Sequence, residues 1–183
     1  EIAGDLSRLA APDEIMQSVG ARLGEFLHVS SCIFADVDEA KNEAVIHHGW
    51  NTANVPSLKQ TFRLADYFGE EFRRAGRAGE TIAVSDTATD ERANAEAYAK
   101  LKLGAFVTVP FQKQGRWTAN ITVTSQDARD WRADEIELLQ EIASRIFPRI
   151  ERARAEAALR ESEERLRLLV ESATDYSIFH AGR

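Results

Sequence analysis

The sequence has 183 residues, of which 44% are hydrophobic and 29% charged, with 10 glycines and 4 prolines. This composition excludes a disordered or fibrous chain, and the length predicts one domain with an appendage. The net charge of -7 argues against a nucleic-acid surface, which would show a basic face. A single cysteine, Cys32, excludes an internal disulfide framework and fits a reducing compartment, so we expect a cytoplasmic protein. No apolar run approaches the ~18 residues that span a bilayer, so we expect no membrane segment in this chain.

The first part of the chain predicts a helix followed by a β-hairpin. Residues 12–27, PDEIMQSVGARLGEFL, place Pro12 in the first turn of an amphipathic helix. The apolar residues on the predicted core face are Ile15, Val19, Leu23 and Phe26. Two runs rich in β-branched and aromatic residues, SCIFADV (31–37) and EAVIHHGW (43–50), flank a turn-like segment and predict two antiparallel strands.

The middle of the chain predicts short elements. TFRL (61–64) and ETIAVSD (80–86) are typical of brief strands, and ADYFGEEFRRAG (65–76) predicts a short helix broken near its last glycine, Gly76. The alanine-rich segment 90–102 predicts a further helix. We expect Thr89 or Asp90 as its N-cap and Gly104 as its stop.

The last third predicts a second hairpin and a long helix. AFVTVPF (105–111) and RWTANITVT (116–124) flank QKQG, whose glycine supplies the turn. A helix then begins near DWRADEIELL (130–139) and continues for about forty residues with 3 and 4 spacing. The strands come in hairpin pairs rather than in alternation with helices. We therefore expect an α+β fold, an antiparallel sheet with helices packed on it.

The terminal helix is heavily charged. Three Glu-to-Arg pairs at i,i+4 spacing support it, namely Glu156 with Arg160, Glu161 with Arg165, and Glu163 with Arg167. One apolar stripe runs through Leu139, Ile142, Ile146, Ile150, Ala153 and Ala157. A second, on a shifted face, runs through Ala155, Leu159, Ser162, Leu166 and Leu169. A narrow apolar seam flanked by charge predicts pairing with the same helix of a second copy; the alternative is a lone solvated helix held by ion pairs. Pro148 predicts a kink within residues 144–148.

Two regions resemble known signalling domains. ALRESEERLRLLVESATDYSIF (158–179) resembles the signalling helix and the opening helix and strand of a PAS domain, as found in bacterial sensor histidine kinases. The preceding chain resembles the GAF domain of the same kinases through CIFADVD, VIHHGW, FRLADYFGEEFRRAGRAGETIAVSD, FVTVPFQKQGRWTANITV and RDWRADEIELLQEIASR. The expected organisation is a GAF domain (1–147), a signalling helix linker (148–170) and the truncated start of a PAS domain (171–183). We expect the rest of that domain and a kinase core further along a longer parent chain.

The GAF resemblance implies a six-stranded antiparallel sheet, flanking helices that dimerise, and a regulatory role. It also gives a meaning to the strand 116–124, where Trp117, Ala119, Ile121 and Val123 alternate with Thr118, Asn120, Thr122 and Thr124. If the polar face is covered, Asn120 and Thr122 become buried groups that seek a ligand or water; if it is open, the strand is merely half-buried. The residues similar to those that wall the GAF pocket are Trp50, Phe62, Arg63, Asp66, Tyr67, Asp86 and Tyr98.

The sequence lacks the residues that several specialised activities of GAF relatives require. NAEAYAKLKLG stands where bilin-carrying relatives have a cysteine and a histidine, the cyclic-nucleotide pattern is missing, and one cysteine is too few for a free methionine sulfoxide reductase. His47 and His48 are adjacent in a predicted strand and point to opposite faces, which disfavours a zinc site. We expect no cofactor, no metal and, because no nucleophile and base converge, no enzyme activity.

The resulting expectation is a sensory and dimerisation module of a signal transduction histidine kinase in a two-component system. It would relay a small-molecule or conformational signal through its C-terminal helix. The alternative is a ligandless spacer that only holds two chains together.

Overall fold

The computed structural model describes residues 11–55 and 57–180, without the side chains of residues 48 and 173–180. Six antiparallel strands form one sheet in the order β3-β2-β1-β6-β5-β4. The strands are β1 (Ser31–Asp38), β2 (Glu43–Asn51), β3 (Thr61–Arg63), β4 (Ile82–Val84), β5 (Ala105–Lys113) and β6 (Arg116–Ser125). The helices are α2 (Pro12–Leu27), α3 (Leu64–Tyr67), α4 (Glu70–Ala78), α5 (Ala95–Lys100) and α6 (Ala133–His180). The α+β architecture expected from the sequence is confirmed.

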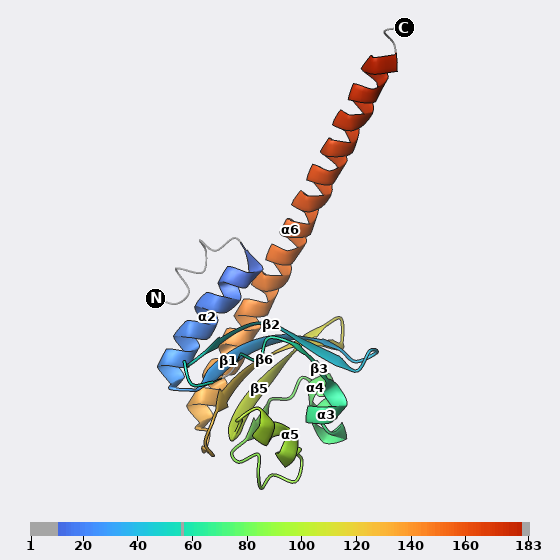
Figure 1. The fold of residues 1–183 in the computed structure, drawn as a ribbon. Helices are drawn as coiled ribbons and strands as arrows, with labels where there is room; N and C mark the ends of the chain where they lie inside the picture. The colour runs from blue at the N-terminus through green and yellow to red at the C-terminus, as the bar shows by residue number, and fades with distance from the viewer. Residues whose placement is uncertain (1–10, 56, 181–183) are drawn as a thin grey trace.

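The sheet separates two layers of helices. Figure 1 shows α2 and the first part of α6 side by side on one face, with α3, α4 and α5 on the other, and α6 projecting far beyond the sheet. The larger core fills the space between the sheet and the α2–α6 pair, where side chains such as Val19, Ile121 and Ile146 are 1% exposed or less. Within the described residues, none of the helices combines the length and apolarity of a membrane span.

Helix α2 begins as predicted and differs in one core position. Pro12 lies at its start, and His28 ends it in the left-handed conformation, with φ of 51°. Phe26, expected on the core face, is 66% exposed, while Leu27 is buried. The buried stripe advances by four residues from Val19 to Leu27, so a residue one position earlier points away from the sheet.

The hairpin of β5 and β6 contains a bulge that moves one tryptophan to the other face. Phe111 pairs with Ala119 and Gln112 with Trp117, so β6 carries one extra residue at this point. Trp117 therefore does not share the α2–α6 face with Ala119. It packs under α4, where a Cβ placed on Gly76 would lie 2.7 Å from the indole Cδ2.

The short helices differ from the predicted boundaries. The break falls at Phe68 and Gly69, between α3 and α4, and α4 passes through Gly76 because the missing side chain there makes room for Trp117. The N-cap of α5 is Asn94, whose side chain accepts a hydrogen bond from the Ala97 N–H, rather than Thr89 or Asp90. This helix has ended by Leu101, so Gly104 does not stop it.

Helix α6 is a single 48-residue helix, longer than predicted. It continues through Pro148, and the kink expected within residues 144–148 is not seen in the ribbon (Figure 1). Pro148 lies on the exposed side of the helix, so water can reach the Ser144 carbonyl that loses its N–H partner, while Phe147 and Ile150 hold the turn against the core.

The end of α6 also differs from the expectation for residues 158–179. The chain stays helical to His180, where the PAS resemblance implied a strand. A helix bonds its own backbone, whereas a strand forms only against a partner strand. Residues 181–183 lie outside the described part of the chain.

Candidate ligand-binding site

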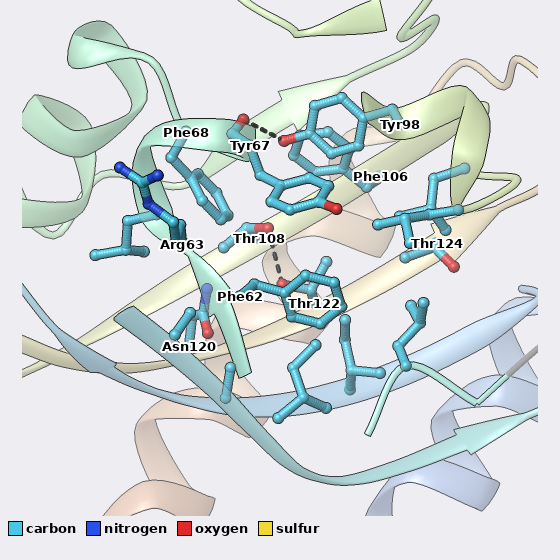
Figure 2. Close-up of a pocket in the computed structure, with 18 residues that line it drawn as sticks. Phe62, Arg63, Tyr67, Phe68, Tyr98, Phe106, Thr108, Asn120, Thr122 and Thr124 are labelled. Atoms are coloured by element: carbon cyan, nitrogen blue, oxygen red, sulfur yellow. Dashed lines mark hydrogen bonds between the residues drawn. The ribbon is translucent and has the colours of Figure 1, made fainter. Parts of the chain in front are cut away.

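A cavity of about 70 Å³ lies on the face of the sheet that α3 and α5 cover. The strands supply its floor and the short helices and loops its cover. The lining residues are Ile33, Ala35, Ala44, Ile46, Leu58, Phe62, Arg63, Leu64, Tyr67, Phe68, Tyr98, Leu101, Leu103, Phe106, Thr108, Asn120, Thr122 and Thr124. The cavity is therefore built from five of the six strands and from both helices that close over them (Figure 2).

Aromatic rings from both the strands and the covering helices line the cavity. Phe62 and Tyr67 meet edge to face with centroids 5.1 Å apart, Tyr67 and Tyr98 meet in the same way at 5.8 Å, and Phe106 lies 5.2 Å from Tyr98. The Tyr98 hydroxyl donates to the Tyr67 carbonyl at 2.8 Å, which ties α5 to α3 (Figure 2). Burial raises the pKa of the Tyr98 phenol well above its usual value, so this donor keeps its proton. The short helices over the cavity are therefore linked to each other by ring contacts and by this hydrogen bond.

Four polar side chains of β5 and β6 line the cavity, and they differ in whether their hydrogen bonds are satisfied. The hydroxyls of Thr108 and Thr122 bond to each other at 2.8 Å. The Thr124 hydroxyl bonds to Ser31. Asn120 is 3% exposed, and its Oδ1 has no hydrogen-bond partner among the described residues. Leaving a buried acceptor without a hydrogen-bond partner lowers the stability of the fold by about 1–3 kcal/mol. A bound molecule or water that donates a hydrogen bond to Asn120 Oδ1 would remove this cost.

The sequence-predicted site residues fall into two groups. Six line the cavity, namely Phe62, Arg63, Tyr67, Tyr98, Asn120 and Thr122. Arg63 is exposed and lies at the rim, whereas Asn120 and Thr122 are buried in the floor. The structure does not bring the other three, Trp50, Asp66 and Asp86, to the cavity.

Trp50 lies on the opposite face of the sheet. A bulge in β2, where Phe34 pairs with His48 and Ala35 pairs with Ile46, reverses the alternation beyond it. The indole packs against α2 instead, so closely that a Cβ placed on Gly24 would lie 2.0 Å from Trp50 Cζ3.

The two aspartates serve the backbone and the surface. The Asp86 carboxylate accepts the Ala88 N–H at 2.9 Å and so caps the turn after β4. Asp66 is exposed, and its carbonyl accepts the Asn94 side-chain N–H at 3.0 Å. Both hold the loops that surround the cavity cover rather than facing its interior.

The sequence reasoning missed most of the apolar lining and two polar residues, Thr108 and Thr124. Thr108 is the polar residue that interrupts the apolar strand AFVTVPF, and pairing β5 with β6 places it opposite Thr122. Strand alternation was thus a usable signal for Thr108 and for Phe106 two residues before it. The loop residues Leu58, Leu101 and Leu103 carry no comparable signal.

The cavity offers binding groups and no recognisable catalytic set. Its lining includes no His, Cys, Lys or carboxylate. Cys32 is fully buried on the α2 side of the sheet, where burial raises the pKa of its thiol to about 12. The described residues contain no cluster of three or more His, Cys, Asp or Glu that could hold a metal ion. The arrangement favours retention of an apolar molecule.

Comparison with protein-family models identifies one family. A family model described as GAF domain matches residues 11–147. No curated protein matches the chain.

Solved structures of the same fold are similar to the chain at low identity. The GAF domain of PixJ from Thermosynechococcus elongatus, in its blue-light absorbing form, is 19% identical, with TM-score 0.67, covering 82% of this chain and 91% of that one. The GAF domain of a phosphoenolpyruvate-protein phosphotransferase from Coxiella burnetii is 18% identical, with TM-score 0.69 and coverage of 86% and 92%. A free methionine-R-sulfoxide reductase from Neisseria meningitidis, in complex with its substrate, is 17% identical, with TM-score 0.68 and coverage of 85% and 87%. These likenesses show the fold.

Proposed function

The chain belongs to the GAF domain family, and on that premise we propose that it is the cytoplasmic sensory and dimerisation module of a signal transduction histidine kinase. A GAF domain is a sensory or signalling module. In our proposal a small molecule bound in the cavity changes how two copies pack, and α6 carries the change into a following domain. The kinase context is supported by the similarity of residues 158–179 to a signalling helix followed by a PAS domain.

One observation carries the proposal: the cavity and α6 lie on opposite faces of the same two strands. In β6, Asn120 and Thr122 line the cavity, while Ile121 and Val123 enter the core that α6 completes. In β5, Thr108 faces the cavity in the same way. A ligand that displaces either strand therefore acts on α6 without an intermediate element.

An ion pair adds a second connection where α6 leaves the sheet. Arg154 Nη1 lies 2.9 Å from Asp36 Oδ1 on β1, and His47 Nε2 lies 2.9 Å from the other oxygen of the same carboxylate. All three side chains are about one-third exposed or more, so the energy of each pair is small. Their value to the proposal is positional, because they fix the helix to the β1–β2 hairpin at its exit.

The two apolar stripes of α6 have different partners. The first is buried against the protein's own sheet and α2 as far as Ala153, which is 7% exposed, so this part is not available to a second copy. The second stripe is open to solvent, with Leu159, Leu166 and Leu169 each 61–62% exposed. We propose that the dimer forms through the second stripe alone, as a parallel coiled coil.

The alternative function is a ligandless dimerisation spacer. The observation that favours it is the small volume of the cavity, about 70 Å³. A few ordered waters could fill a cavity of this size.

Spin-label distances test the relay. Glu164→Cys places a label on the solvent face of α6, and Cys32 does not react because it is buried. We expect one distance distribution across the dimer, which shifts when a ligand occupies the cavity. A single chain in concentrated solution by light scattering, or unchanged distances at saturation with a bound small molecule, would remove the relay. Native mass spectrometry of freshly purified protein separates sensor from spacer, because a copurifying small molecule supports the sensor.

A further inference from the structure

One polar atom that lines the cavity has no hydrogen-bond partner among the described residues. Among the described residues only two buried side-chain polar atoms lack a hydrogen-bond partner, Arg73 Nε and Asn120 Oδ1, and only Asn120 lines the cavity. The neighbouring hydroxyls of Thr108 and Thr122 satisfy each other. Figure 2 shows the Asn120 amide among the lining side chains, on the side of the cavity where Arg63 and Phe68 lie. An occupant that donates one hydrogen bond would satisfy it.

The walls exclude a charged occupant. The polar groups of the lining are the Asn120 amide, the threonine and tyrosine hydroxyls and the Arg63 guanidinium, and Arg63 is exposed at the rim. All other lining side chains are aliphatic or aromatic. An ion moved into such surroundings loses its hydration without a buried counter-charge in return. Aromatic edges and faces instead favour a flat ring among them.

The size of the cavity sets the scale of the occupant. Its volume of about 70 Å³ corresponds to roughly five water-sized groups, at about 10–15 Å³ each. One six-membered ring with a single substituent requires only small adjustments of the cover. A nucleotide or a tetrapyrrole requires the cover to be rebuilt.

We propose that the cavity binds an uncharged single-ring compound that carries one O–H or N–H donor, a phenol-like molecule. The donor bonds to Asn120 Oδ1, and the ring lies among Phe62, Tyr67, Tyr98 and Phe106. This assignment rests on the proposed sensory function and adds the chemical class of its ligand. Ordered water alone and a ligand of another class are the competing occupants.

Titration of the whole chain with phenol, toluene and benzoate tests the assignment. Toluene keeps the ring and removes the donor, and benzoate adds a charge. We expect phenol to bind about tenfold more tightly than toluene, because toluene leaves the Asn120 acceptor buried and unpaired. Benzoate should show no saturable binding. In a ¹⁵N spectrum, the Asn120 side-chain amide should shift with phenol and much less with toluene.

The variant Asn120→Leu keeps the number and branching of side-chain heavy atoms and removes the amide. In this variant the ratio of the dissociation constants of toluene and phenol should fall from about ten to about one. The matched control is Asn54→Leu, the same exchange at an exposed residue between β2 and β3, which should keep the wild-type ratio. The ranking of the three probes on the unaltered chain does not depend on either variant.

The proposed ligand class and the proposed sensory function are overturned by different outcomes. Benzoate binding as tight as that of phenol, or an unchanged ratio in Asn120→Leu, overturns the ligand class. A copurifying small molecule of another chemistry then leaves the sensory function standing. If none of the three probes binds and freshly purified protein carries no small molecule, both proposals fall and the spacer remains.

Discussion

Replacing Gly24 with alanine tests the placement of Trp50 against α2. A Cβ at position 24 would lie 2.0 Å from Trp50 Cζ3 and 2.1 Å from Cε3, far inside van der Waals contact. Alanine gains about 1 kcal/mol over glycine in a helix interior. Forcing extra volume into a packed core costs about 1–3 kcal/mol, occasionally more, and an overlap this deep lies at or beyond the upper end. We expect a net loss of about 2 kcal/mol, because the indole must leave its place.

Thermal unfolding followed by circular dichroism measures this loss. For a chain of this length, about 2 kcal/mol lowers Tm by roughly 4–8 °C, and protein concentration must be held fixed because association also stabilises. Gly20→Ala, one turn earlier, is the matched control, since its Cβ would lie 3.3 Å from Trp50 Cβ and need only a small adjustment. Trp50→Leu in the Gly24→Ala background should recover part of the loss. If Gly24→Ala is as stable as the wild type, Trp50 does not pack on α2 and its assignment to the cavity returns.

Three further predictions concern α4, the buried thiol and α6. Gly76→Ala should lower the stability of the protein by about 1–2 kcal/mol, because its Cβ would lie 2.7 Å from the Trp117 ring; an unchanged Tm would show that α4 packs elsewhere. Cys32 should resist thiol reagents at pH 8 until the protein unfolds. Its folded pKa of about 12 lies above the unfolded value of ~8.5, so the stability it contributes below pH ~8.5 should be lost, by about 1.4 kcal/mol per pH unit, as the pH rises from there towards 12. Wild type and Cys32→Ala showing the same alkaline slope would contradict this. Leu166→Glu should convert the proposed dimer to a monomer in light scattering, while Glu164→Ala on the opposite face should leave the mass unchanged.

Sequence periodicity was sufficient to locate the strands and long helices. Alternation and apolar spacing arise from burial on one face, and that cause acts throughout β1, β2, β5, β6, α2 and α6. The same rule failed for side-chain direction beyond a bulge. Trp50 follows the bulge in β2 and Trp117 precedes the bulge in β6, and in each case the extra residue sends the indole to the unexpected face. A bulge depends on the pairing of two strands, so one strand read alone does not reveal it.

The candidate site was partly accessible from the sequence. Asn120 and Thr122 were found from alternation, and the aromatic residues of the cover, such as Tyr67 and Tyr98, from the resemblance to a family. Asp66 and Asp86 were included on the same resemblance, whereas the structure gives them roles at the surface and in a turn. Which polar group remains without a partner follows only from the complete set of contacts, which no local pattern contains.

The point where α6 loses contact with the sheet, after Ala153, divides it into two segments with different sources of order. The first is held by the core, whereas the described contacts of the second include ion pairs one turn apart within the helix. Most of the stability of helices in proteins comes from packing of an amphipathic face. Neighbouring helical rods would supply the missing stabilisation. Helix formation and association of the distal segment are then coupled. The mean residue ellipticity at 222 nm should therefore become more negative as the protein concentration rises. Dilution would unfold the distal segment of α6 while the domain around the sheet stays folded.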